Sequence, residues 1–261
     1  MKKIRLRNRK GQTIVGVLEE PQGEIRGTCV IEHGYSGHKE ADHIQKIKNA
    51  FLENGFITFN FDATNSFNES DGEFIDATLG LHHEDLEDVV KWVKKQEWFV
   101  KPLALTGHSM GGYAVARYAE DYPDEVDILV PVAPVVSGKL NFEAFERFHP
   151  GGLDTWKRDG IRIEKSARRG VMKRMTWESM EERLDHDLLP DADKITIPTL
   201  LIVGSKDESC PPDHVEKLLK KISSKDKALK IIEGAPHTYR NEKDLEEVKH
   251  SISSWLKDII E

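Results

Sequence analysis

The stretch that decides the fold runs Leu103-Ala104-Leu105-Thr106-Gly107-His108-Ser109-Met110-Gly111-Gly112. It places a serine between two glycines, directly after a predicted strand and before a predicted helix. The chain must reverse sharply at the serine, and glycine two positions before and after it tolerates the crowding that this turn creates. The pattern therefore predicts a nucleophile elbow, with the Ser109 hydroxyl held at the carboxyl edge of a sheet.

The bulk composition limits the classes of protein to consider. The 261 residues suit one large α/β domain, and the net charge of −8 argues against a protein that binds nucleic acid. The two cysteines, Cys29 and Cys210, are too few for a disulfide framework or a metal site. Cys29 lies inside an apolar strand, where we expect it to be buried.

Neither a secretion signal nor a membrane span is evident in the chain. No apolar core follows Met1-Lys2-Lys3, and no run of about eighteen apolar residues occurs. We expect a soluble, cytoplasmic protein with no membrane span and no nucleic-acid partner, and the composition is compatible with esters, peptides or other small-molecule substrates. The oligomeric state stays open, a homodimer included.

Short apolar or alternating runs predict eight strands. These are Ile4–Asn8, Thr13–Glu19, Thr28–Glu32, Ile57–Phe61, Leu103–Thr106, Ile128–Val132, Thr199–Val203 and Leu229–Ile232. Amphipathic helical patterns separate most of them, and the first two form a hairpin around Lys10-Gly11. This alternation predicts an α/β protein with a mostly parallel sheet that is covered by helices on both faces.

One segment breaks the alternation of strands and helices. No strand is evident between Val136 and Pro190, where aromatic and methionine residues are spread through charged sequence. We predict a mainly helical insertion, a lid or cap, that folds over the carboxyl edge of the sheet. The expected division is a core of residues 1–135 and 191–261 with a cap of residues 136–190.

A serine hydroxyl needs an imidazole to accept its proton and an acid to fix the imidazole tautomer. Asp207 follows the predicted strand that ends at Val203, and His237 follows the one that ends at Ile232. Both should lie at the carboxyl edge, in the chain order serine, acid, histidine. The alternatives without a catalytic role are an aspartate in a surface turn for Asp207 and an ordinary loop histidine for His237. Glu208, next to Asp207, is a second acidic residue on the same loop.

Other histidines compete for the role of base. His108 adjoins the serine, but in a tight turn it points away, so we expect a structural residue beneath the elbow. We expect His214 and His250, which lie off the apolar stripes of their helices, to be solvated. His82 and His83 are expected to precede a helix and to cap it or pack there.

An oxyanion formed at Ser109 would need two backbone donors. The amide of Met110 lies at the predicted start of a helix, whose dipole favours negative charge. The second donor should come from the loop His33-Gly34-Tyr35-Ser36-Gly37-His38, where the Tyr35 amide is the candidate. A glycine-rich loop without chemistry is the alternative.

Four motifs carry a resemblance to a known family. They are His33-Gly34-Tyr35-Ser36-Gly37, Gly107-His108-Ser109-Met110-Gly111-Gly112, Gly204-Ser205-Lys206-Asp207 and Pro236-His237. In these the chain resembles serine esterases of the α/β-hydrolase superfamily over nearly its whole length, above all bacterial cinnamoyl and feruloyl esterases and monoacylglycerol-lipase-like enzymes. The resemblance implies an α/β-hydrolase fold with eight strands, an insertion after the sixth and no cofactor or metal.

The chain departs from these relatives after the fourth strand. Many of them carry Asp-x-Arg-Gly-His-Gly there, whereas this chain has Asp62-Ala63-Thr64-Asn65-Ser66-Phe67-Asn68-Glu69-Ser70. The insertion offers no motif to match residue by residue, so hydroxycinnamoyl specificity follows from similarity alone.

The expected reaction is acyl transfer from an ester to water through Ser109, His237 and Asp207. An aminopeptidase or amidase of the same fold is one alternative, and it would need acidic groups such as Glu143, Glu146 or Glu178 to hold the substrate amine. A non-catalytic relative that binds a ligand or partner is another.

A basic cluster also lies in the insertion. It consists of Lys165, Arg168, Arg169, Lys173 and Arg174. We expect a solvated helix face, with a site for substrate carboxylates as the alternative.

Overall fold

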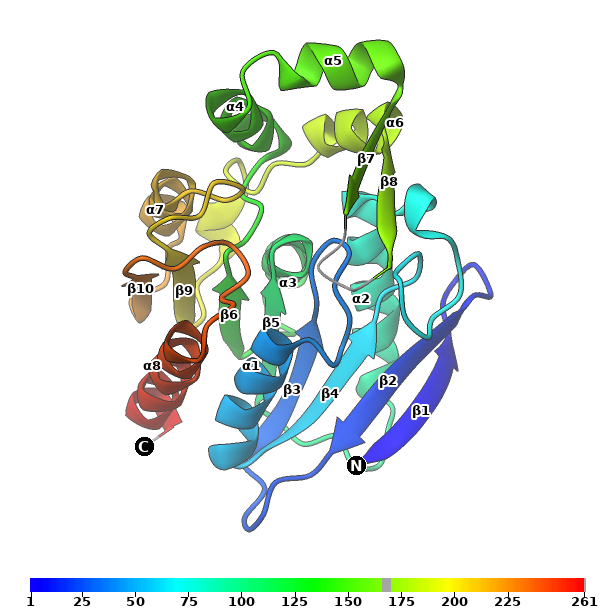
Figure 1. Ribbon diagram of the computed structural model, residues 1–261. Coiled ribbons are helices and arrows are strands. Elements are labelled where there is room, and N and C mark those ends of the chain that lie inside the picture. Colours follow the sequence, from blue (N-terminus) through cyan, green and yellow to red (C-terminus); the bar gives the residue numbers. More distant parts are fainter. Residues whose placement is uncertain (166–169, 261) are drawn as a thin grey trace.

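The computed structural model describes residues 1–165 and 170–260 of the chain. An eight-stranded sheet lies at its centre, with helices on both faces (Figure 1). Its strands are β1 (Lys2–Arg7), β2 (Thr13–Glu19), β3 (Gly27–Glu32), β4 (Phe56–Asp62), β5 (Leu103–His108), β6 (Ile128–Val132), β9 (Thr199–Gly204) and β10 (Lys227–Ile232). The predicted α/β-hydrolase architecture is confirmed.

The order of strands explains where a ligand site can form. The sheet runs β1-β2-β4-β3-β5-β6-β9-β10, and its neighbours are parallel except that β2 runs antiparallel to β1 and to β4. The chain passes from β3 to β4 on one side and later returns to β5 on the other. Ligands bind in the crevice at the carboxyl ends of strands where such a switch occurs.

Five helices cover the sheet. They are α1 (Asp42–Glu53), α2 (Leu79–Val93), α3 (Met110–Asp121), α7 (Pro212–Lys221) and α8 (Glu242–Ile260). A short helix η1 (Phe74–Asp76) precedes α2, and another, η3 (Ala192–Lys194), precedes β9. No helix within the described ranges combines the length and the apolar character that a membrane-spanning segment requires.

The inner strands of the sheet are buried on both faces, and this explains why they are mostly apolar rather than alternating. Val30 and Leu105 point into a core that α2, α3 and α7 complete. Ile31 and Ala104 point the other way, into a core that α1 and α8 complete. Cys29 is fully buried in this second core, as its apolar strand predicted.

The segment between β6 and β9, here called the inserted segment (residues 136–190), lies above the carboxyl ends of the strands (Figure 1). Its elements are α4 (Gly138–Phe148), α5 (Gly152–Asp159), β7 (Ile161–Lys165), β8 (Met172–Thr176), α6 (Trp177–Glu181) and η2 (Glu182–Asp185). The expectation that it holds no strand is wrong, because β7 and β8 pair antiparallel. Both strands are short and rich in charged residues, so their alternation is hard to recognise in the sequence.

A small apolar core joins the inserted segment to the rest of the molecule. Trp156, Met175 and Met180 pack there with Phe74 and Ala77, which lie in and just after η1. The indole Nε1 of Trp156 donates a hydrogen bond of 3.0 Å to the carbonyl oxygen of Met175, which fixes α5 against β8.

Candidate active site

Ser109 stands in the tight turn between β5 and α3, with φ 59° and ψ −112°. A non-glycine residue at this φ is strained, and such strain is typical of functional turns. A Cβ at Gly107 would lie 2.4 Å from the carbonyl oxygen of Gly111, and one at Gly111 would lie 2.6 Å from that of Glu32. These close approaches explain the two flanking glycines and the position of Ser109 at the carboxyl edge of the sheet.

The two side chains that the sequence pairs with Ser109 lie next to it. His237 is on the loop after β10, and Asp207 is on the loop after β9. Nε2 of His237 lies 3.0 Å from Oγ of Ser109, and Nδ1 of His237 lies 2.7 Å from Oδ2 of Asp207. The imidazole can therefore accept a proton from the hydroxyl while it donates its other N–H to the carboxylate.

Backbone amides orient the carboxylate of Asp207. Its Oδ1 accepts hydrogen bonds from the amides of Ser209 at 2.9 Å and Cys210 at 2.8 Å, which leaves Oδ2 for His237. The Asp207 residue is buried, with 2% of its surface exposed, whereas the adjoining Glu208 is exposed. The geometry favours Asp207 over Glu208 as the acid that contacts the imidazole.

Tyr35 and Met110, whose amides are the predicted donors, line the same cavity as Ser109. Met110 is the first residue of α3, so its amide precedes the first turn of helical hydrogen bonds. The Tyr35 amide belongs to the oxyanion loop (residues 33–38), which a hydrogen bond of 2.8 Å from the Gly37 amide to the Gly34 carbonyl closes. Within the described residues, no other group accepts a hydrogen bond from either amide. Both remain available to a developing negative charge.

His33 holds the oxyanion loop in place. Its Nδ1 donates to the carbonyl of Gly34 at 2.8 Å, while its Nε2 accepts from the amide of Ala63 at 3.1 Å. This pattern requires a neutral ring, and burial lowers the pKa of His33 to about 4. The ring thereby ties the loop after β3 to the segment after β4.

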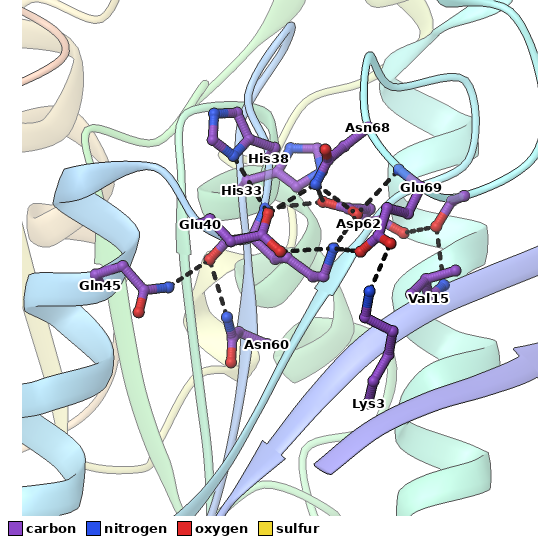
Figure 2. A network of polar contacts seen from close by, with 12 residues as sticks. Lys3, Val15, His33, His38, Glu40, Gln45, Asn60, Asp62, Asn68 and Glu69 are labelled. Carbon is purple, nitrogen blue, oxygen red and sulfur yellow. Dashed lines mark hydrogen bonds and ion pairs between the residues drawn. The ribbon is translucent and has the colours of Figure 1, made fainter. Parts of the chain in front are cut away.

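An ion cluster around the buried Lys39 and Asp62 lies where the chain departs from the family motif after β4 (Figure 2). Nζ of Lys39 lies 2.6 Å from Asp62, 2.7 Å from Glu69 and 2.9 Å from Glu40. Burial alone would lower the pKa of Lys39, but hydrogen bonds to these carboxylates raise it above its ordinary value. Because Lys39 follows the oxyanion loop directly, the cluster anchors that loop to the segment after β4. The pattern of charges in the sequence does not predict this cluster.

The histidines next to the site divide into structural and surface residues. His108 is buried, and its Nε2 donates to the carbonyl oxygen of His237 at 2.7 Å, so it supports the loop of the base. His250 is exposed, as expected. His214 is only 2% exposed, so the expectation that it is solvated is wrong. A 3.3 Å ion pair between Arg147 and Asp213 brings α4 close to the start of α7, where His214 lies.

The region around His82 and His83 also differs from the prediction, because both residues lie inside α2 rather than before it. The helix starts early because the Thr78 side chain accepts a hydrogen bond from the Leu81 amide and caps it. His82 is buried, with its Nδ1 2.9 Å from Oε1 of Glu32. Burial lowers the pKa of His82 to about 4 and raises that of Glu32, so burial opposes the charged form of both side chains.

A cavity of about 1000 Å³ opens in front of Ser109, between the sheet edge and the inserted segment. Aromatic and methionine side chains form its apolar lining. They are Tyr35, Phe67, Met110, Phe145, Trp156, Met175 and Met180. Charged residues of the inserted segment line it too, among them Arg162, Glu164, Lys173 and Arg183. Sequence reasoning missed Arg183, because nothing in its neighbourhood marks it.

The predicted basic cluster is not a helix face. Lys165, Lys173 and Arg174 lie on the hairpin of β7 and β8, while Arg168 and Arg169 lie outside the described residues. Lys165 and Lys173 line the cavity. The expectation of a solvated helix face is therefore wrong for these two residues, and the alternative of a substrate-facing cluster gains support.

The acidic residues proposed to hold an amine lie elsewhere. Glu143, Glu146 and Glu178 are exposed and do not line the cavity, whereas Glu164 does. Among the described residues, no group of three or more histidine, cysteine, aspartate or glutamate side chains is arranged to hold a metal ion.

Comparisons with known proteins show what the chain and its fold are similar to. The chain is 24% identical to monoacylglycerol lipase of Mycolicibacterium smegmatis, with 94% of this chain and 93% of the lipase covered. It is 25% identical to human monoglyceride lipase, with 95% and 88% covered. The solved structure of Est1E from Butyrivibrio proteoclasticus with ferulic acid bound superposes with a TM-score of 0.78 at 25% identity, over 98% of both chains.

The family model Hydrolase_4, described as serine aminopeptidase S33, matches residues 23–158 and 154–244. These ranges include the elbow, the oxyanion loop and the loops that carry Asp207 and His237. The chain therefore belongs to this family of α/β-hydrolases, and its relatives include lipases and esterases.

Proposed function

We propose that this protein is a serine carboxylesterase that cleaves small or medium-sized carboxylic esters through an acyl-enzyme. The observation that carries the proposal is the continuous hydrogen-bonded path from Ser109 through His237 to Asp207. Such a path at the mouth of a large cavity is the arrangement that acyl transfer requires.

In the acylation half of the reaction, Oγ of Ser109 attacks the ester carbonyl carbon while Nε2 of His237 takes the hydroxyl proton. Asp207 accepts the Nδ1 hydrogen bond throughout and stabilises the imidazolium that forms. His237 then returns the proton to the leaving alkoxide as the carbon–oxygen bond of the alcohol breaks. The acyl group remains on Ser109.

In the deacylation half, a water molecule takes the place of the alcohol. His237 removes one of its protons as its oxygen attacks the acyl carbon, and the same proton passes to Oγ of Ser109 as the acid leaves. In both halves the amides of Tyr35 and Met110 stabilise the tetrahedral oxyanion. One donor of this kind typically contributes about 100- to 1000-fold in rate.

The inserted segment acts as a cap in this proposal, placed over a core of residues 1–135 and 191–261. Its position above the strand ends and its share of the cavity lining support this role. The aromatic lining and the volume of about 1000 Å³ suit an acyl group of moderate size. Hydroxycinnamoyl esters are candidate substrates, since the relative Est1E binds ferulic acid.

A second candidate function is that of an aminopeptidase, which the description of the matching family favours. Such an enzyme needs a carboxylate to hold the substrate amine. Glu164 lines the cavity, but its carboxylate already lies 2.5 Å from Arg162 and 3.9 Å from Lys173. These pairs neutralise it, and for this reason the esterase is the better supported of the two.

Turnover of p-nitrophenyl butyrate against amino-acid p-nitroanilides tests the proposal. We expect the wild type to hydrolyse the ester and the Ser109→Ala variant to lose about 10⁴- to 10⁶-fold in kcat. Ser209→Ala removes another serine hydroxyl from the same cavity and should retain the activity. Hydrolysis of the anilides alone would favour the aminopeptidase, and activity that survives Ser109→Ala would contradict the mechanism.

A further inference from the structure

Arg183 is a cation at the active-site cavity without a carboxylate partner. Its guanidinium lines the cavity together with Ser109, and among the described residues no acidic oxygen lies within 4 Å of it. Its Nη1 donates to Oδ1 of Asn141 at 2.7 Å, and its Nη2 lies 4.0 Å from the sulfur of Met110. Nε is buried and makes no hydrogen bond. Most of the five N–H donors of the guanidinium therefore remain unused.

The surroundings of Arg183 partly compensate its charge but do not neutralise it. The guanidinium carbon lies 5.2 Å from the centre of the Tyr35 ring, in a cation–π contact. An unpaired guanidinium with a buried donor is costly, and a planar fork of N–H groups matches a carboxylate. Tyr35 and Met110 also carry the amides proposed for the oxyanion, so an anion bound by Arg183 would be part of the substrate in the same cavity.

The backbone that carries Arg183 is fixed to the core. A Cβ at Gly138 would lie 1.7 Å from the Arg183 carbonyl oxygen, so η2 rests directly on the start of α4. The neighbouring Glu182 accepts hydrogen bonds from the amides of Leu79 and Gly80 at the start of α2. Arg183 is thus held in position before a substrate arrives, which favours specific binding.

The hairpin of β7 and β8 adds positive charge to the part of the cavity lining that the inserted segment forms. Its cavity side carries Arg162, Glu164 and Lys173, whereas Ile163 and Met172 point outward with 55% and 49% of their surfaces exposed. A surface hairpin usually buries its apolar side and exposes its charges. With Lys165 at the end of β7, the hairpin gives the cavity wall three cations against one carboxylate, before Arg183 is counted.

We infer that the substrate is an ester that carries a carboxylate, which Arg183 binds. This inference rests on the proposed esterase function and names its substrate class. The anionic group belongs either to the acyl half or to the alcohol half of the ester, and the chemistry of recognition is the same for both. Arg183 is a specificity-determining residue in this scheme, and it does not touch the reacting atoms.

Two pairs of isosteric substrates test the inference. For the acyl half, mono-p-nitrophenyl adipate is compared with its terminal amide, p-nitrophenyl 5-carbamoylpentanoate. For the alcohol half, 4-carboxyphenyl butyrate is compared with 4-carbamoylphenyl butyrate. We expect the wild type to prefer the carboxylate of one pair by roughly 10- to 100-fold in kcat/KM, the value of a charge-assisted hydrogen-bonded contact.

Variants assign this preference to one side chain. Arg183→Gln should bring the preference close to 1 by slowing the carboxylate substrate far more than its amide twin, whereas Arg183→Lys should keep part of it. Arg174→Gln removes the same charge from the exposed side of β8 and should keep the whole preference and the wild-type rate of fluorophosphonate labelling. Far-ultraviolet circular dichroism shows that all variants are folded.

Two outcomes separate the inference from the function on which it rests. If the wild type hydrolyses both members of each pair equally well, the carboxylate inference is overturned while the esterase stands, and this result needs no variant. If the wild type hydrolyses none of the four esters and no fluorophosphonate reacts with it, the esterase proposal itself fails.

Discussion

The two walls of the cavity are built in different ways. At the sheet edge the backbone fixes the reactive groups: Ser109 in its strained turn, Asp207 under two amides and the amides of the oxyanion loop. On the opposite wall, side-chain contacts such as Trp156 with Met175 and Arg162 with Glu164 hold the inserted segment together. This difference suggests that the sheet edge determines the reaction and that the inserted segment determines which substrate is accepted.

Asp207→Asn tests the sheet-edge wall with the largest expected effect. The amide can keep the contacts of Oδ1 but presents the wrong partner to His237, so we expect kcat for ester hydrolysis to fall by about 10³- to 10⁴-fold. Steady-state kinetics measure this loss. Glu208→Gln, one residue away, should change kcat little. Equal losses in the two variants would show that the charge of the loop, rather than the contact with His237, is what matters.

Much of this wall follows from the sequence. The strands around the elbow are buried on both faces and therefore mostly apolar, and a parallel sheet brings the residues after β5, β9 and β10 to one edge. For this reason Ser109, Asp207 and His237 could be placed together from their order alone. The burial of His214 could not be predicted, because it depends on the tertiary surroundings of α7 rather than on the apolar stripe of that helix.

Lys39→Met tests a part of the sheet-edge wall that side chains hold. Without the ammonium, the buried carboxylate of Asp62 keeps no charged partner, so the free energy of unfolding should fall by about 3–5 kcal/mol. Urea denaturation measures it. Lys249→Met breaks a half-exposed ion pair with Glu53 and should have a small effect. Similar midpoints for the two variants would contradict the anchoring role of the cluster.

Acid should weaken the protein through its buried histidines. Burial lowers the pKa of His43 to about 3, and those of His33 and His82 to about 4. Unfolded histidines take up protons below about 6.5, so in the window from about 6.5 to 4 the unfolded state binds more protons and stability is lost as the pH falls.

The contribution of the His43 ring to this pH dependence can be measured by comparing the wild type with a variant that lacks the ring. His43→Gln should reduce the loss of unfolding free energy between pH 7 and pH 5 by roughly 1–2 kcal/mol, because a glutamine has no proton to take up in this range. His250→Gln, on the surface, should leave the pH dependence unchanged. An unchanged slope in His43→Gln would show that this ring is not held neutral by the fold.

Trp156→Phe tests the inserted segment with the smallest expected effect. The variant loses the hydrogen bond to the Met175 carbonyl, worth about 1 kcal/mol, and loosens α5 against β8. We expect KM to rise a few-fold while kcat stays the same, as the reactive groups lie on the other wall. A fall in kcat with unchanged KM would contradict the separation of substrate binding from the reaction between the two walls.

The inserted segment was harder to predict than the sheet. The strands β7 and β8 have only five residues each, and they turn Arg162 and Lys173 inward and Ile163 outward, against the usual pattern. The partners of Lys39 and the isolation of Arg183 depend on contacts between distant segments. Neither leaves a periodic signal in the sequence.

The most direct measurement is to map the site at which a fluorophosphonate reacts with the folded protein. After digestion, mass spectrometry should find the adduct on the peptide that contains Ser109 and on no other, and the folded Ser109→Ala variant should take up none. Attachment to a different residue, or a folded wild type that stays unmodified, would contradict the assignment of Ser109 as the nucleophile.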